Sequence, residues 1–275
     1  MLDLLEIPAE VVDPVPGVPL PEAPPALSVE EISYSYREGA EPALSDVSFT
    51  VEAGSTVALV GATGSGKTTT AKLLARLADP AHGRILVGGI DLRDIAPDSL
   101  RERLGMVPQD GLLFDTSVAE NVALGRPGAT AAEVRAAFTD LGLDTWLDDL
   151  PRGGDTQVGE RGENLSMGER QLVALARAYL AAPMCLILDE ATSSVDPATD
   201  VRLTRAMRRL AAGRTTITIA HRLATAEQAD EILVLDRGRL VERGSHAHLV
   251  AADGVYARLH ASWLDVTATG AAAVG

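Results

Sequence analysis

Short apolar or alternating runs dominate the first third of the chain, and this is the pattern of β-strands. Glycine, proline and aspartate bound the runs, as they commonly bound strands. We expect strands in LSVEEISYSY (27–36), VSFTVEAG (47–54), STVALVG (55–61) and GRILVGG (83–89). A helix is expected directly after Gly66, in KTTTAKLLARLADP, and should end at Asp79-Pro80 because proline stops a helix.

The middle third has a helical pattern instead. TAAEVRAAFTDLGL opens on a capping box, in which Thr130 and Glu133 satisfy each other's backbone N–H groups at a helix start. TWLDDL and RQLVALARAYL continue the helical pattern, and no clear strand interrupts it. We therefore expect a helical subdomain at about residues 111–182, inserted between strand-rich segments.

Strands and helices alternate in the last third, which favours a parallel α/β sheet. MCLILDE (184–190) and RTTITIAH (214–221) are expected strands, and DPATDVRLTRAMRRLAAG (196–213) is an expected helix between them. EILVLDRGRLVERG then predicts a hairpin that turns at Asp236-Arg237-Gly238, followed by two helices.

Seven of the fifteen prolines lie between Pro8 and Pro25. This density excludes a helix and predicts a semi-rigid extended linker at residues 1–26, ahead of a folded unit at 27–275. The preceding MLDLLEI resembles the end of a longer amphipathic helix. A disordered N-terminal tail is an equally good interpretation of the composition.

Composition narrows the class of protein. Hydrophobic residues make up 46% and charged residues 23%, the balance of a soluble globular protein, and no run is long enough to span a bilayer. The start of the chain does not resemble a secretory signal. The single cysteine, Cys185, lies in an apolar run and is expected in the core of a protein from a reducing compartment. The net charge of −15 disfavours nucleic acid as a partner.

One glycine-rich segment predicts a nucleotide site. GATGSGKTTT (61–70) fits G-x-x-x-x-G-K-[ST] and lies between an expected strand and an expected helix, the context that this motif requires. Its glycines let backbone N–H groups close around phosphate oxygens at a positive helix N-terminus. Lys67 should reach the β- and γ-phosphates, and Thr68 should ligate Mg²⁺. The expected nucleotide-binding residues are Gly61, Thr63, Gly64, Ser65, Gly66, Lys67, Thr68 and Thr69.

The apolar strand LILDE ends in two acids. Asp189 is expected to hold Mg²⁺ through water, and Glu190 to orient or deprotonate the attacking water. Neighbouring carboxylates at a strand end are often simply solvated, but together with the glycine-rich loop they indicate a nucleotide hydrolase.

GATGSGKT, LSMGERQ and LILDEATSSVD occur in this order, and residues 27–265 thereby closely resemble the nucleotide-binding domain of an ABC transporter. The resemblance implies a P-loop NTPase core with a parallel sheet, an N-terminal antiparallel β subdomain and an inserted helical subdomain. It also implies ATP and Mg²⁺ as ligands. In that family the matching residues have known roles: Tyr36 stacks on adenine, Gln109 couples Mg²⁺ and γ-phosphate to the membrane domain, Asp196 lies in the loop that crosses the dimer interface, and His221 contacts γ-phosphate.

The same resemblance implies a head-to-tail dimer around two ATP molecules, in which LSMGE faces the γ-phosphate held by the other subunit. A helix N-terminus attracts anions, and Ser166 and the backbone at Gly168 can approach a phosphate. Ser166 and Glu169 also form a capping-box pattern that would start this helix in any protein. Both interpretations can hold together.

VGERG (158–162) resembles the exporter loop that touches the membrane domain. The proline-rich leader resembles the connection that joins the membrane domain of an exporter to this domain. The chain is therefore expected to hydrolyse ATP for export at the cytoplasmic face of the cell membrane, with a transmembrane domain in the same full-length chain. A non-transport ABC ATPase of DNA or translation and an importer subunit are the alternatives. Chromosome-maintenance members carry long coiled coils between the two motifs, whereas here only about 100 residues without heptads separate Lys67 from Ser166.

Two positions depart from the family's usual signature sequence, Leu-Ser-Gly-Gly-Gln. Met167 and Glu169 replace a glycine and a glutamine, and a side chain or carboxylate there opposes close approach of a phosphate. The crossing loop also reads SSVD in place of the usual Ser-Ala-Leu-Asp. A homodimer and a heterodimer with an intact partner signature both remain open.

Overall fold

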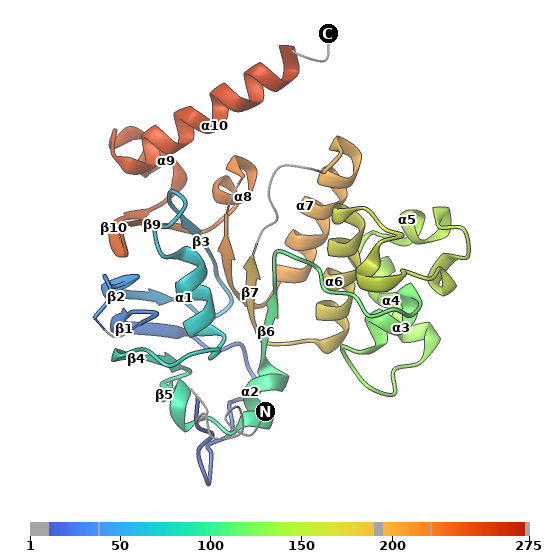
Figure 1. Ribbon diagram of the computed structural model, residues 1–275, viewed down its shortest axis with the longest axis horizontal. Coiled ribbons are helices and arrows are strands. Elements are labelled where there is room, and N and C mark those ends of the chain that lie inside the picture. The colour runs from blue at the N-terminus through green and yellow to red at the C-terminus, as the bar shows by residue number, and fades with distance from the viewer. Residues whose placement is uncertain (1–10, 38, 190–194, 221, 273–275) are drawn as a thin grey trace.

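A computed structural model describes residues 11–37, 39–189, 195–220 and 222–272, with residues 265–272 described by their backbone alone. Two sheets lie side by side, and most of the helices flank the larger one (Figure 1). The smaller sheet has four antiparallel strands in the order β2-β1-β4-β5. These strands are β1 (Leu27–Tyr34), β2 (Leu44–Val51), β4 (His82–Val87) and β5 (Ile90–Asp91).

The larger sheet has six strands in the order β10-β9-β3-β8-β7-β6. The other five strands run parallel to one another, and β10 pairs antiparallel with β9 through a hairpin. Strands β3, β7, β8 and β9 are almost wholly buried, as apolar strands covered on both faces should be. The six are β3 (Thr56–Val60), β6 (Leu104–Val107), β7 (Cys185–Asp189), β8 (Thr215–Ile219), β9 (Glu231–Asp236) and β10 (Arg239–Gly244). The predicted fold class and hairpin are confirmed.

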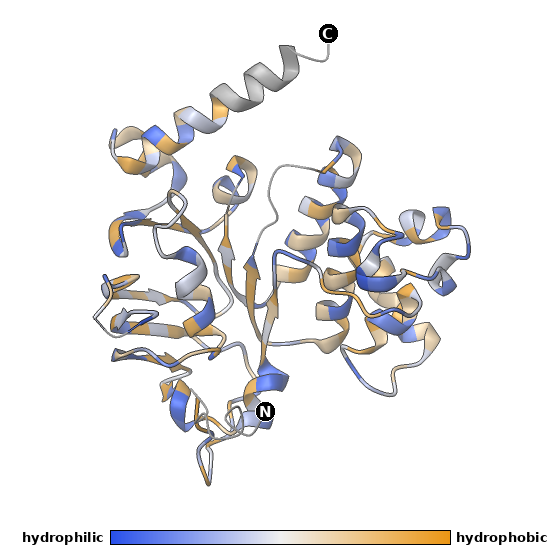
Figure 2. Ribbon diagram, in the orientation of Figure 1, coloured by the Kyte–Doolittle hydropathy of each residue, from blue (hydrophilic) through white to orange (hydrophobic). Residues whose placement is uncertain are grey.

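The described residues form ten α-helices, and most of them carry both hydrophilic and hydrophobic residues (Figure 2). Helices α3 to α6 pack together beyond β6 and β7, and α7 packs on α6 (Figure 1). The bounds are α1 (Lys67–Leu74), α2 (Pro97–Arg103), α3 (Val118–Ala123), α4 (Ala131–Leu141), α5 (Asp144–Asp149), α6 (Met167–Ala181), α7 (Pro197–Ala211), α8 (Leu223–Glu227), α9 (His246–Ala251) and α10 (Val255–Ala272). None of these helices is long and apolar enough to cross a bilayer.

Period-two alternation along the central strands divides the core. Val57 and Leu59 of β3 share one cluster with Leu73 and Leu74 of α1. Their neighbours Ala58 and Val60 join the opposite cluster, which is formed with α8, α9 and α10. The central sheet is therefore covered on both faces, and α1 is fixed on one of them.

The predicted capping box of α4 is present, with Thr130 and Glu133 each accepting from the other's backbone N–H. Phe138 of this helix is fully buried, and its ring lies 6.0 Å from that of Trp146. Both rings belong to a second core cluster shared with α6 and α7.

The proline-rich segment is docked on the folded unit from residue 11 onward, whereas MLDLLEI lies outside the described residues. Val18 forms a parallel bridge with Ile95, donating to the Asp94 carbonyl at 2.8 Å, and Leu20 is buried. The Pro25 carbonyl accepts from Thr215 Oγ1 at 2.7 Å.

The helix expected up to Asp79-Pro80 ends earlier, at Leu74. Arg76 adopts a left-handed conformation with φ of 52°, and its buried guanidinium donates to the Val12 carbonyl at 2.9 Å. Leu77 N donates to the Lys72 carbonyl at 2.9 Å and Arg76 N to the Leu73 carbonyl at 3.0 Å, so a left-handed C-cap ends the helix before proline can. Strand β6 and helices α2, α3 and α8 were not expected; β6 is only four residues long and contains Gly105.

Phe138→Ala should lower the free energy of unfolding by about 3–5 kcal/mol, because it leaves a cavity at a fully buried site. Val201→Ala, on the exposed side of α7, should change it by less than about 0.5 kcal/mol. Urea denaturation of both variants measures the difference, and equal losses would contradict the assigned core.

Candidate functional site

The glycine-rich loop joins β3 to α1 as expected. Lys67, the first residue of α1, is buried, and its Nζ donates to the carbonyls of Gly61 at 2.7 Å and Ala62 at 3.0 Å. Gly66 caps the helix with φ of 107°, a conformation that favours glycine. A Cβ on Gly61 would lie 2.6 Å from Ser65 Oγ, so this close approach also requires glycine.

A pocket of about 420 Å³, called the P-loop pocket below, lies against this loop. It is lined by Tyr36, Ala43, Thr63, Gly64, Ser65, Gly66, Lys67, Thr68, Thr69 and Gln109. Its walls therefore combine a helix N-terminus, one buried cation, hydroxyl groups and one aromatic ring. This combination suits a phosphate group joined to a flat ring system.

Tyr36 follows β1 and is 54% exposed, which is high for a large aromatic ring. Its hydroxyl lies 3.0 Å from Thr69 Oγ1, and Lys72 Nζ lies 5.2 Å from the ring centroid. Tyr34 meets the ring edge-on at a centroid distance of 5.2 Å. These contacts fix the ring at the rim of the pocket while leaving part of it accessible.

Gln109 follows β6 and also lines the pocket. Its backbone carbonyl accepts from Gln171 Nε2 of α6 at 3.0 Å. The segment that closes the pocket is thus joined directly to the helical part of the molecule.

Asp189 ends β7, and its Oδ1 is buried without a hydrogen-bond partner among the described residues. Burial raises the pKa of this carboxyl group; the Lys67 charge opposes the shift and Asp110 adds to it. Burial likewise lowers the pKa of Lys67, against the attraction of Asp189. An unpartnered buried carboxylate oxygen beside a phosphate-type loop fits a hard divalent cation such as Mg²⁺.

The second predicted anion-binding element is the N-terminus of α6. Ser166 is its N-cap, and the expected capping box is confirmed: Ser166 N donates to Glu169 Oε2 at 2.8 Å, and Glu169 N to Ser166 Oγ at 3.2 Å. Trp146 Nε1 of α5 donates to Glu169 Oε1 at 3.2 Å. The Glu169 carboxylate is therefore held back toward Ser166 and Trp146.

Gly168 is buried, and its lack of a side chain has a reason within this chain. A Cβ there would lie 2.6 Å from Thr199 Cγ2 and 2.8 Å from Val195 Cγ1. The preceding Met167, by contrast, is 37% exposed.

Asp196 is the N-cap of α7 and accepts from the backbone N–H groups of Ala198 and Thr199 at 3.1 and 3.0 Å. These hydrogen bonds, that of Thr199 first, hold the pKa of Asp196 below its usual value. The acid therefore has a structural role in its own chain.

The expected residues fall into two groups. Tyr36, Gln109 and the loop residues 63–69 share one pocket, with Asp189 next to Lys67. Ser166, Gly168 and Asp196 do not line it. Glu190 and His221 lie outside the described residues. Ala43, Lys72 and Trp146 also contribute contacts, but an alanine, a second helix lysine and a distant tryptophan belong to no motif that would reveal this in the sequence.

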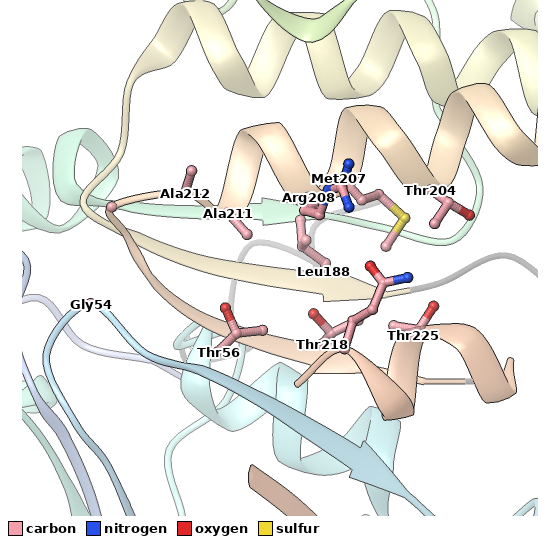
Figure 3. A pocket seen from close by; sticks show the side chains of 12 residues that line it. Gly54, Thr56, Leu188, Thr204, Met207, Arg208, Ala211, Ala212, Thr218 and Thr225 are labelled. Atoms are coloured by element: carbon pink, nitrogen blue, oxygen red, sulfur yellow. The ribbon is translucent and has the colours of Figure 1, made fainter. Parts of the chain in front are cut away.

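A second cavity, of about 270 Å³, lies on the other face of the central sheet. Thr56, Leu188 and Thr218 of the central strands line it, with Met207 of α7 above Leu188 and Thr225 of α8 beside Thr218 (Figure 3). None of the nucleotide-motif residues lines this cavity, so it is separate from the P-loop pocket.

A family model described as "ABC transporter" matches residues 44–193. A "Fatty acid ABC transporter ATP-binding/permease protein" of Mycobacterium tuberculosis is 46% identical over 93% of this chain and 40% of its own length. An "ATM1-type heavy metal exporter" of Novosphingobium aromaticivorans is 46% identical over 95% of the chain and 43% of its own length. A solved bacterial Atm1-family ABC exporter with ATP bound superposes with a TM-score of 0.88 at 44% identity, over 95% of this chain and 46% of that one.

The chain thus spans less than half the length of these relatives. The family model covers more than half of the chain, and the relatives share close to half of its residues. The P-loop pocket, the α6 N-terminus and the two-sheet fold agree with this likeness, and the chain belongs to the ABC transporter family.

Proposed function

We propose that this chain is the domain that binds and hydrolyses ATP in an ABC exporter. The observation that carries the proposal is the pocket lined by Lys67 and the N-terminus of α1, together with the unpartnered Asp189 oxygen whose carboxyl group interacts electrostatically with Lys67. The names of the relatives, which pair an ATP-binding part with a permease or describe an exporter, support the choice of export.

In this proposal the loop N–H groups and Lys67 bind the β- and γ-phosphates, and Tyr36 stacks on adenine. Lys67 already lies at the carbonyls of Gly61 and Ala62, so it needs only a side-chain rotation to reach a phosphate. The Tyr36 ring stands at the rim of the same pocket. These positions suit a nucleotide that lies from the loop toward β1.

Thr68, Gln109 and Asp189 would hold Mg²⁺, which supplies positive charge against the negative charge of the phosphate oxygens. Glu190 follows Asp189 directly in sequence. As a water molecule attacks the γ-phosphorus, Glu190 takes a proton from that water. The bond between the γ-phosphorus and the oxygen that bridges it to ADP breaks, which releases ADP and phosphate. His221 would contact the γ-phosphate.

The expected residues at the N-termini of α6 and α7 are assigned to the nucleotide site of a second ABC domain. Ser166, Gly168 and Asp196 would complete the partner's nucleotide site in a head-to-tail dimer. A transmembrane domain N-terminal to the linker 1–26, in the same full-length chain, would place the domain at the cytoplasmic face of the membrane.

Glu190→Gln should leave ATP binding intact and lower hydrolysis by about 10²–10⁴-fold, because it removes the positioned base. Phosphate release measures turnover, and calorimetry measures binding. Glu102→Gln, at an exposed acid of α2 away from the pocket, is the matched control and should retain full activity. Near-normal turnover in Glu190→Gln would remove this residue from the mechanism.

Tyr36→Ala should weaken ATP binding several-fold, since an aromatic stacking contact contributes on the order of 1 kcal/mol. Tyr36→Trp should bind as well as the unchanged chain. Tyr36→Phe separates the ring from the hydroxyl contact with Thr69 and should also bind normally. Equal affinity in all four proteins, measured by fluorescence titration, would show that adenine does not lie on this ring.

Mg-ATP should convert the Glu190→Gln chain from monomer to dimer, a change that light scattering detects. Adding Met167→Gly in this background should strengthen dimerisation if the exposed Met167 side chain hinders the partner's phosphate. A homodimer that forms equally well with and without Met167→Gly would argue against a weakened signature and hence against an obligate heterodimer. No change in mass with ATP would contradict the dimer.

A further inference from the structure

Three side chains with metal-binding atoms converge far from the P-loop pocket. Glu227 is the last residue of α8, His246 is the first of α9, and His260 lies in α10. Each offers one ligand atom, and these atoms all lie within 4.8 Å of one another. Segments up to 33 residues apart in sequence thus bring two imidazoles and one carboxylate together.

The distances are close to those of a zinc site. His246 Nε2 lies 3.6 Å from Glu227 Oε1, and the rings of His246 and His260 are 5.2 Å apart between centroids. Ligand atoms around a tetrahedral zinc ion are about 3.3 Å apart, given metal–ligand bonds of about 2.0 Å. Side-chain rotation can bring the three groups closer, since Glu227 is exposed and the two histidines are only partly buried.

Tyr256 fixes the orientation of one imidazole. Its hydroxyl lies 2.7 Å from His246 Nδ1, and its ring is fully buried in the core cluster of α8, α9 and α10. With Nδ1 engaged by Tyr256, Nε2 points to the carboxylate of Glu227. A hydrogen bond to the non-ligating nitrogen is the usual companion of a metal-binding histidine.

A simple surface ion pair explains this arrangement less well. The His246–Glu227 pair is partly exposed, with side-chain exposures of 29% and 42%, and such pairs contribute little to stability. An ion pair also gives no role to His260, whose ring is held against His246 and Tyr256. Two imidazoles and one carboxylate form a complete set of three ligands for one divalent ion.

We propose that Glu227, His246 and His260 bind a divalent transition-metal ion of the zinc type, with water completing the coordination. Imidazole nitrogens with one carboxylate suit Zn²⁺ and disfavour Mg²⁺, which prefers oxygen ligands. The site is therefore distinct in chemistry and in place from the Mg²⁺ assigned to the nucleotide pocket. A bound ion would join α8, α9 and α10 through one centre.

Titration of the nucleotide-free 275-residue chain with ZnCl₂, followed by calorimetry, tests the proposal. We expect one saturable site per chain, unaffected by millimolar Mg²⁺. His260→Ala and Glu227→Gln should each weaken it by at least about tenfold, comparable to the larger effects of disturbed metal sites. His248→Ala removes an exposed histidine from the same short helix and should leave the affinity unchanged.

Hydrogen exchange provides a second readout that does not depend on the variants. Zn²⁺ should slow exchange in both α8 and the start of α10, because its ligands come from both, and Glu227→Gln should abolish this protection. The proposal would be overturned by the absence of saturable binding, or by equal Zn²⁺ affinity in Glu227→Gln and His248→Ala. Zn²⁺ binding that does not slow hydrogen exchange in α8 would also overturn it.

Discussion

The parallel register of three central strands determines where the chemistry can occur. Ile219 of β8 lies opposite Leu59 of β3 on one side and opposite Asp189 of β7 on the other. The segments that leave these strands therefore start from one level of the sheet: the glycine-rich loop after β3, the segment that begins at Asp189, and the segment that begins at Ala220. Because the strands are buried on both faces, a slip in register would expose apolar side chains and separate these groups. The apolar character of the strands thus specifies where the polar segments that follow them begin.

Local chemistry explains what could be predicted from the sequence. The strand that precedes GATGSGKT, the capping boxes at Thr130 and Ser166, and the turn at Asp236-Arg237-Gly238 depend on neighbouring residues, and all are present. The end of α1 was predicted wrongly because Arg76 adopts the left-handed conformation of a helix C-cap, which usually belongs to glycine and which arginine does not signal in the sequence. Strand β6 was missed because four residues with a central glycine give too little pattern. The roles of Glu190 and His221 remain predictions.

The convergence of Glu227, His246 and His260 could not be predicted from the sequence either. Each residue alone is an ordinary surface side chain on a short or terminal helix, and no spacing in the sequence connects them. Their proximity depends on Tyr256 packing under α9 and on α10 crossing beside α8. Likewise, Trp146 reaches Glu169 only because α5 and α6 belong to one packed cluster. Tertiary packing, rather than local preference, creates these relationships.

The docked leader changes how motion can pass through this molecule. A proline-rich chain free in solvent would act as a slack tether, and a displacement at one end would be absorbed before it reached the other. Here the Val12 carbonyl is held by Arg76, two residues beyond the helix that begins with Lys67, and Pro25 is held by the first residue of β8. Whatever precedes Val12 is consequently coupled to both the far end of the phosphate-binding helix and the root of a central strand. The segment has the mechanical character of a strut with two anchor points, able to transmit push as well as pull.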